Sequence, residues 1–144
     1  MKTITILISF LLAVAAASAA ETTVAGPKGG RMLIAHPVRA EFFVTTERRV
    51  ELSFFDEAGK TVSPGTTAVT VTAETTGGRV AVPLVSQDAT LVSVEPLPPG
   101  DPYRVVVQVR SAPGARPSNF RIELNLHECG ECQRAEYACT CASH

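Results

Sequence analysis

The chain has 144 residues, and its 13 Lys and Arg nearly balance its 14 Asp and Glu, which leaves a formal net charge of −1. This length suits one domain with a buried core. The charges are dispersed along the sequence, so a nucleic-acid partner has no electrostatic basis and none is expected. The sequence contains no Ser/His/Asp or Cys/His arrangement suited to nucleophilic catalysis, and we do not expect an enzyme.

The first segment, residues 1–20, is predicted to be a secretory signal peptide. It begins with the basic Lys2, continues with an apolar run from about Ile4 to Ala17, and ends in small residues. The run is shorter than the roughly 20 apolar residues that a membrane span needs. We therefore expect a mature protein that does not span the membrane after signal cleavage and lies outside the cytoplasm, most simply in a periplasm.

The body of the chain, residues 21–126, is predicted to be an antiparallel β-sandwich of the immunoglobulin-like type with about seven or eight strands. From about Arg31 onward, apolar and polar residues alternate with a period of two, which is typical of half-buried strands. Near the end of this body, Phe120, Ile122 and Leu124 are expected to face the core. Strands are expected at residues 32–35, 38–44, 48–56, 68–74, 80–85, 90–94, 103–110 and 119–126.

Glycine and proline residues divide these runs into strands and turns. Pro83 has no backbone N–H to donate, so its strand is expected at a sheet edge or at a bulge. His36 precedes Pro37 between two short strands, and we interpret it as a turn residue rather than a metal ligand. The segment GPKGGRML, residues 26–33, is interpreted as a flexible turn that leads into the first strand.

The last segment, residues 127–144, is predicted to be an irregular tail rich in Cys and His. The alternation stops after Leu126, and all four cysteines of the chain follow it. Cysteines that stabilise a fold as disulfides are usually spread along the chain, because long closed loops gain the most stability. The clustering of the cysteines indicates that they form one functional site. The candidate metal ligands are Cys129, Cys132, Cys139 and Cys141, with His127 and His144 as auxiliary donors.

The spacing of these cysteines favours a metal site. CGEC places two thiolates three positions apart, CTC places two more two positions apart, and the six residues QRAEYA between them allow the pairs to meet. Four thiolates suit tetrahedral zinc and equally suit the soft ion copper(I). Two alternatives stay open: structural disulfides, which oxidising compartments favour, and a thiol-redox centre at CGEC.

Three segments within about residues 26–110 stand out by their sequence: GPKGGRMLIAHPVRAEFFV, RRVELSFFDEAGKTVSP and AVTVTAETTGG. Together they resemble the small β-domain at the N-terminal end of some heavy-metal efflux adaptors, the membrane-fusion proteins of the cobalt–zinc–cadmium and copper type. The adaptor pattern often has His where this chain has Lys28, and the chain lacks the helical hairpin and lipoyl-like parts of an adaptor. The resemblance implies a periplasmic accessory domain connected with metal handling.

From the sequence we therefore expect a periplasmic accessory protein that captures a thiophilic metal, zinc or copper(I), and buffers it or hands it on. The expected setting is a heavy-metal efflux system, with an efflux-pump adaptor or another envelope protein as partner. The alternative is a structural or interaction module of the cell envelope whose tail is pinned by disulfides. A thiol-redox protein is a third interpretation.

Overall fold

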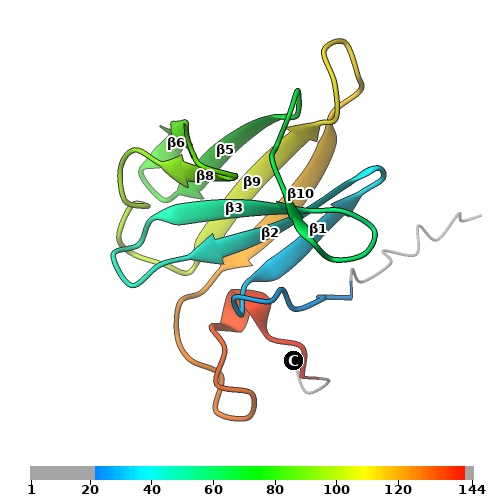
Figure 1. The fold of residues 1–144 in the computed structure, drawn as a ribbon. Helices are drawn as coiled ribbons and strands as arrows, with labels where there is room; N and C mark the ends of the chain where they lie inside the picture. The colour runs from blue at the N-terminus through cyan, green and yellow to red at the C-terminus, as the bar shows by residue number, and fades with distance from the viewer. Residues whose placement is uncertain (1–21, 142–144) are drawn as a thin grey trace, which may run out of the picture.

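The computed structural model describes residues 22–141. Within this range the chain forms ten β-strands and one short 3-10 helix (Figure 1). The predicted signal peptide, residues 1–20, lies outside the described residues, so its assignment stays a prediction. No helix in the described range has the length and apolar character that a membrane crossing requires. The elements are β1 (Arg31–Ala35), β2 (Val38–Val44), β3 (Val50–Phe55), β4 (Thr61–Val62), β5 (Ala68–Thr75), β6 (Gly78–Val82), β7 (Leu84–Gln87), β8 (Thr90–Ser93), β9 (Tyr103–Arg110), β10 (Ser118–Leu124) and η1 (Glu136–Ala138).

These strands form two antiparallel sheets, which confirms the predicted all-β sandwich. The first sheet has the order β1-β2-β3-β8-β7 with β4 added beside β3, and the second has the order β10-β9-β5-β6. The described residues contain ten strands rather than seven or eight. One reason is that β4 is too short to show an alternation in the sequence, and the other is that the single strand expected at 80–85 is divided into β6 and β7.

This division occurs at Pro83. β6 ends at Val82 as an edge strand of the second sheet, and β7 begins at Leu84 as an edge strand of the first sheet. The chain therefore crosses from one sheet to the other at the one residue of this run that cannot donate a backbone hydrogen bond. The carbonyl of Pro83 accepts a hydrogen bond from the N–H of Val94 at 2.9 Å. The expected edge position holds for both strands that flank this proline, although the single strand expected around it is divided in two.

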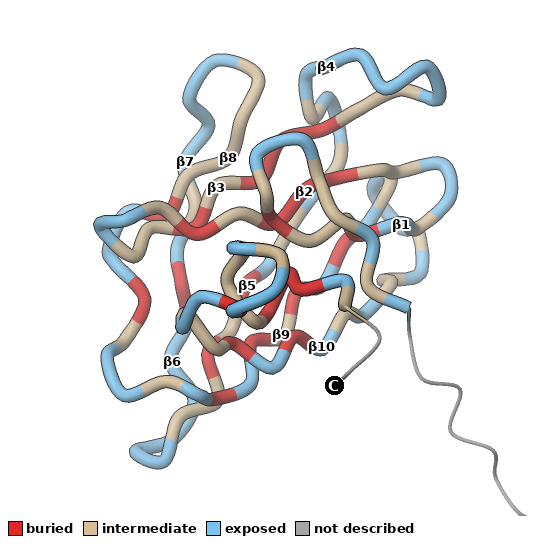
Figure 2. Tube along the Cα trace, turned by 90° about the horizontal axis from the view of Figure 1, so that it is seen from below, coloured by how far each residue is buried: buried red, intermediate tan, exposed pale blue. Residues whose placement is uncertain are grey.

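The alternation of side chains along the strands correctly predicts the core. In β9, Val105 and Val107 are buried, whereas Arg104 and Gln108 on either side of this pair are exposed. The same holds in β10, where Ile122 and its neighbour two residues on are fully buried. Figure 2 shows the buried segments along the strands and the exposed segments at the turns. Inward-facing residues from both sheets belong to one hydrophobic cluster.

One acidic side chain, that of Glu41 in β2, is fully buried. Its carboxylate accepts hydrogen bonds from the backbone N–H groups of Lys28 at 2.9 Å and Gly30 at 2.8 Å. A Cβ atom on Gly26 would overlap the Glu41 carboxyl group, and one on Gly30 would overlap the backbone of β2. The GPKGG segment, interpreted from the sequence as a flexible turn, is therefore a close-fitting cover over a buried carboxylate.

The region where the tail leaves the sandwich is held by Arg48 and Asp101. The Arg48 guanidinium donates to the Asp101 carboxylate at 2.9 Å and to the carbonyl of Pro98 at 2.6 Å. The second carboxylate oxygen of Asp101 accepts the N–H of Leu126 at 3.2 Å. Burial opposes ionisation of Asp101, but the hydrogen bonds from Leu126 and Arg48 outweigh it and hold the pKa of this carboxyl below its ordinary value.

Replacing Asp101 by Asn should lower the free energy of unfolding at neutral pH by about 1.5–3 kcal/mol, since the change removes a charge that is hydrogen-bonded in the folded state. The folded-state pKa lies below the unfolded value of about 3.9, so the contribution is present above that value and is lost as the pH falls through the folded-state pKa. Urea unfolding of both proteins between about pH 6 and about pH 2 measures the difference. A gap between them that keeps its size at the acid end would contradict this account.

Candidate metal centre

The first two cysteines lie on a short hairpin, residues 128–135, that follows β10. An isolated antiparallel bridge joins the ends of the hairpin. Inside it, the N–H of Cys129 donates to the carbonyl of Arg134 at 2.7 Å, and the N–H of Gln133 donates to the carbonyl of Cys129 at 2.9 Å. Gln133 has a φ of 59°, in the left-handed region, which turns the chain back directly after Cys132. The CGEC segment is therefore a closed loop with defined geometry.

The other two cysteines follow the 3-10 helix η1. The N–H groups of Glu136 and Tyr137 donate to the carbonyls of His127 at 2.9 Å and Asn125 at 3.2 Å, so the helix folds back against the exit of β10. Cys139 ends the helix in an extended conformation, with φ −65° and ψ 137°. Alternate residues of an extended chain face the same way. The CTC spacing thus directs both of its thiols to one side.

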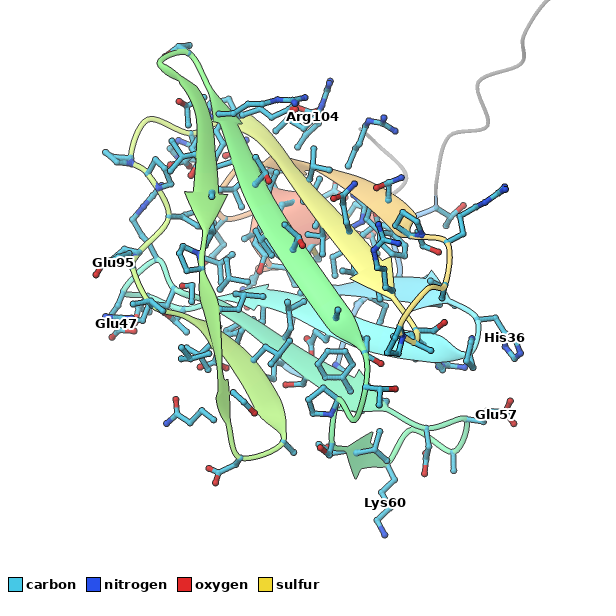
Figure 3. The ribbon with its side chains drawn as sticks, turned by 90° about the horizontal axis from the view of Figure 1, so that it is seen from above. His36, Glu47, Glu57, Lys60, Glu95 and Arg104 are labelled. Atoms are coloured by element: carbon cyan, nitrogen blue, oxygen red, sulfur yellow. The ribbon has the colours of Figure 1, made fainter. Side chains whose placement is uncertain are left out.

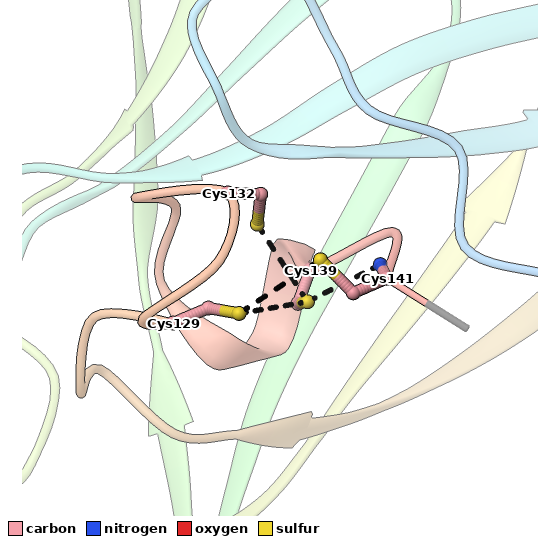
Figure 4. A group of neighbouring side chains, drawn as sticks. All are labelled: Cys129, Cys132, Cys139 and Cys141. Atoms are coloured by element: carbon pink, nitrogen blue, oxygen red, sulfur yellow. Dashed lines mark hydrogen bonds between the residues drawn. The ribbon is translucent and has the colours of Figure 1, made fainter. Parts of the chain in front are cut away.

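The four Sγ atoms converge, with every pair within 4.8 Å (Figure 4). The Sγ of Cys139 lies 3.3 Å from that of Cys129 and 3.6 Å from that of Cys132. The Sγ atoms of Cys129 and Cys141 are 4.0 Å apart. The fold therefore brings together all four cysteines that the sequence analysis selected as candidate ligands, and the group could hold a metal ion.

These separations suit a tetrahedral thiolate centre. With a metal–sulfur bond of about 2.3 Å, a tetrahedron places its sulfurs about 3.8 Å apart. A disulfide requires about 2.05 Å between its sulfurs, whereas even the Sγ atoms of Cys129 and Cys139 are 3.3 Å apart. The observed distances scatter around the tetrahedral value, so a small adjustment of the side chains would complete the coordination sphere.

Backbone N–H groups, burial and neighbouring thiols together shift the pKa values of these sulfurs. The N–H of Arg134 holds the pKa of the Cys132 thiol below its ordinary value. At Cys139 the N–H of Cys141, 3.4 Å from Sγ, favours the thiolate, but burial and the Cys129 thiol outweigh it and the pKa is raised. The pKa of Cys141 is also raised, chiefly by its contact with the Cys139 thiol. Thiols this close ionise together only when a cation lies between them.

Tyr137 fixes the tail to the sandwich. Its side chain is 5% exposed, and its ring meets that of Phe42 edge to face, with centroids 5.8 Å apart. Its hydroxyl oxygen accepts the N–H of Val44 at 3.0 Å. The next residue, Ala138, is fully buried. Tyr137 is not among the residues predicted from the sequence, although the apolar pair Tyr137-Ala138 in an otherwise polar segment is a signal of a buried anchor.

The described histidines lie apart from the sulfur cluster. His127 is exposed, and the group of close metal-ligating atoms in residues 22–141 consists of the four cysteines. His144 lies outside the described residues. The auxiliary role of both side chains stays a prediction. His36 is exposed in the turn between β1 and β2, as expected, and points away from the body of the molecule (Figure 3).

Comparisons with known proteins do not assign the chain to a family. No family model matches it, and neither the curated proteins nor the solved structures contain a match. The likeness of residues 26–110 to efflux adaptor domains therefore stays a prediction. The convergence of the four cysteines is the feature that points to a function.

The Sγ of Cys139 lies close to the Sγ atoms of both Cys129 and Cys132. Cys139→Ser removes one of four soft donors and should therefore weaken cobalt(II) or zinc binding by roughly two orders of magnitude or more. Thr140→Ala is the matched control, since Thr140 lies between two candidate ligands but is exposed, and its hydroxyl accepts a hydrogen bond from the Arg134 side chain at 3.2 Å. Anaerobic competition against a chromophoric chelator measures both affinities. Equal affinities for the two variants would rule out Cys139 as a ligand.

Proposed function

We propose that this protein binds one thiophilic metal ion through its four cysteines and buffers that ion or hands it on. The observation that carries the proposal is the convergence of the four Sγ atoms within 4.8 Å of one another. Four thiols gathered at one point have lost conformational freedom and repel one another when ionised. A bound cation offsets both costs, because it gains four sulfur ligands at the same time. The proposed ligands are Cys129, Cys132, Cys139 and Cys141.

Zinc and copper(I) are the ions that this donor set suits best. Four thiolates form a closed tetrahedral zinc site, and copper(I) shares the preference for soft sulfur. Catalytic zinc keeps one position open for water or substrate, whereas four protein sulfurs fill all positions. We therefore propose that the protein binds a metal and is not an enzyme.

The proposed place of action is the periplasm, in connection with a heavy-metal efflux system. The support comes from the sequence: residues 1–20 have the pattern of a signal peptide, and residues 26–110 resemble the small β-domain of efflux adaptors. The proposed partner is an efflux-pump adaptor or another envelope protein that delivers or receives the ion. Co-purification from membranes of cells grown with added zinc or copper, compared with cells grown without it, tests this part separately.

Full-length protein purified anaerobically should bind one equivalent of cobalt(II) or zinc, or one or more copper(I) ions. Cobalt(II) should produce the intense visible bands of a tetrahedral thiolate complex, because its coordination preferences follow those of zinc at such sites. Replacing Cys139 and Cys141 together by Ser should remove these bands, since two of four sulfur ligands are lost. His127→Ala should leave the bands unchanged if four sulfurs complete the site, and should alter them if the imidazole is a ligand.

The state of the thiols in the cell separates metal binding from the disulfide alternative. Protein alkylated directly in cells should show four protected or metal-bound thiols that become reactive when a chelator is added. If the protein drawn from cells instead has no thiols that react after chelation, and takes up metal only after reduction, the tail is a disulfide clasp. The structural envelope module would then be the better description.

A further inference from the structure

The candidate metal site and the β-sandwich share one element, η1. Tyr137 and Ala138 of this helix belong to the hydrophobic core cluster. Cys139 follows immediately, and its N–H donates to the carbonyl of Glu136 at 3.1 Å. Cys141 is two residues further along an extended segment. The positions of two of the four sulfurs therefore depend on where the Tyr137 side chain lies.

Tyr137 also closes the open end of β2. The pairing of β1 with β2 reaches only to Arg31 opposite Phe42, so Val44 extends beyond the end of β1. The N–H of Val44 donates instead to the hydroxyl oxygen of Tyr137, in a buried hydrogen bond of 3.0 Å. A buried donor that loses its partner destabilises the state in which it is buried. The tail thus completes the hydrogen bonding of β2, although Tyr137 and Val44 are 93 positions apart in sequence.

We propose that Tyr137 is the positioning residue of the metal site. Through Tyr137, metal binding and the end of β2 at Val44 stabilise each other. This inference rests on the proposed function. A bound ion would tie the CGEC hairpin to the CTC segment and so hold Tyr137 against Phe42 and Val44. In the absence of an ion, the docking of η1 depends on its side-chain contacts with the sandwich and on its backbone hydrogen bonds. Linkage requires the effect to be reciprocal, so docking of Tyr137 strengthens metal binding by the same factor.

Three full-length variants separate the parts of this coupling. Tyr137→Phe keeps the ring against Phe42 but removes the acceptor for Val44, and should weaken cobalt(II) binding about fivefold to tenfold. Tyr137→Ala removes the ring as well and should weaken binding about a hundredfold or more. Tyr103→Phe is the matched control, because Tyr103 is the other of the two tyrosines, is buried, and donates its hydroxyl to the carbonyl of Pro98 at 2.7 Å.

Thermal unfolding of the sandwich, followed by the circular dichroism of its strands, reads out the coupling. At a cobalt(II) concentration about a hundredfold above Kd, the wild type should unfold about 10 °C higher than without metal. The Tyr103→Phe control should unfold at a lower temperature than the wild type but keep the same metal-induced rise. Tyr137→Ala should still form the cobalt–thiolate bands at higher metal concentration, with almost no rise in its unfolding temperature.

Hydrogen exchange of the Val44 amide measures the opening of its contact with Tyr137, and comparison with core amides of β9 separates this local opening from global unfolding. Metal should slow the exchange of this amide in the wild type and in Tyr103→Phe, but not in Tyr137→Phe, where the acceptor is missing. If Tyr137→Ala fails to fold, the Tyr137→Phe comparison at Val44 decides the question.

Two negative results have different meanings. Absence of cobalt–thiolate bands in the reduced wild type would overturn the proposed function and this inference together. If the wild type shows normal cobalt–thiolate bands, but metal changes neither its unfolding temperature nor the exchange of the Val44 amide, the inference alone is overturned. The proposed metal site would then still stand.

Discussion

The tail depends on one interaction, the docking of Tyr137 against Phe42 and Val44. Residues 127–141 contain too few apolar side chains to form a core, so they can be ordered only by using the core of the sandwich. β10 fixes one end of this segment, and Tyr137 fixes its middle. The chain between these two points is short, so the hairpin has little freedom to move away from the helix. The convergence of the sulfurs follows from these two attachments.

The sequence was a good guide to the strands and to the cysteines, and a poor one to the contacts between distant segments. Period-two alternation depends on neighbours along one strand, which is why the inward residues of β9 and β10 could be predicted. The meeting of CGEC and CTC could be expected because only six residues separate them. The contact of Tyr137 with Phe42 joins segments 95 positions apart, and no local pattern encodes it.

The burial of Glu41 is a second contact between distant segments that the local sequence pattern does not predict. By its position in β2 it should be an outward, solvated residue, yet it is fully buried under the GPKGG segment. Two of the glycines in that segment are required because any side chain would collide with Glu41 or with β2. The steric need for these glycines therefore explains their presence without reference to a ligand. A similar glycine pattern in another β-domain would be expected wherever a loop covers a carboxylate in this way.

The burial of the four thiols alternates along the tail: Cys129 and Cys139 are buried, whereas Cys132 and Cys141 are partly accessible. An ion held by them would have a sealed side against the protein and an open side toward solvent. An incoming thiol of another protein could approach only from the open side, where it would displace the two accessible sulfurs one at a time. Such stepwise ligand exchange lets a tightly held ion move quickly between proteins without ever being released into solution.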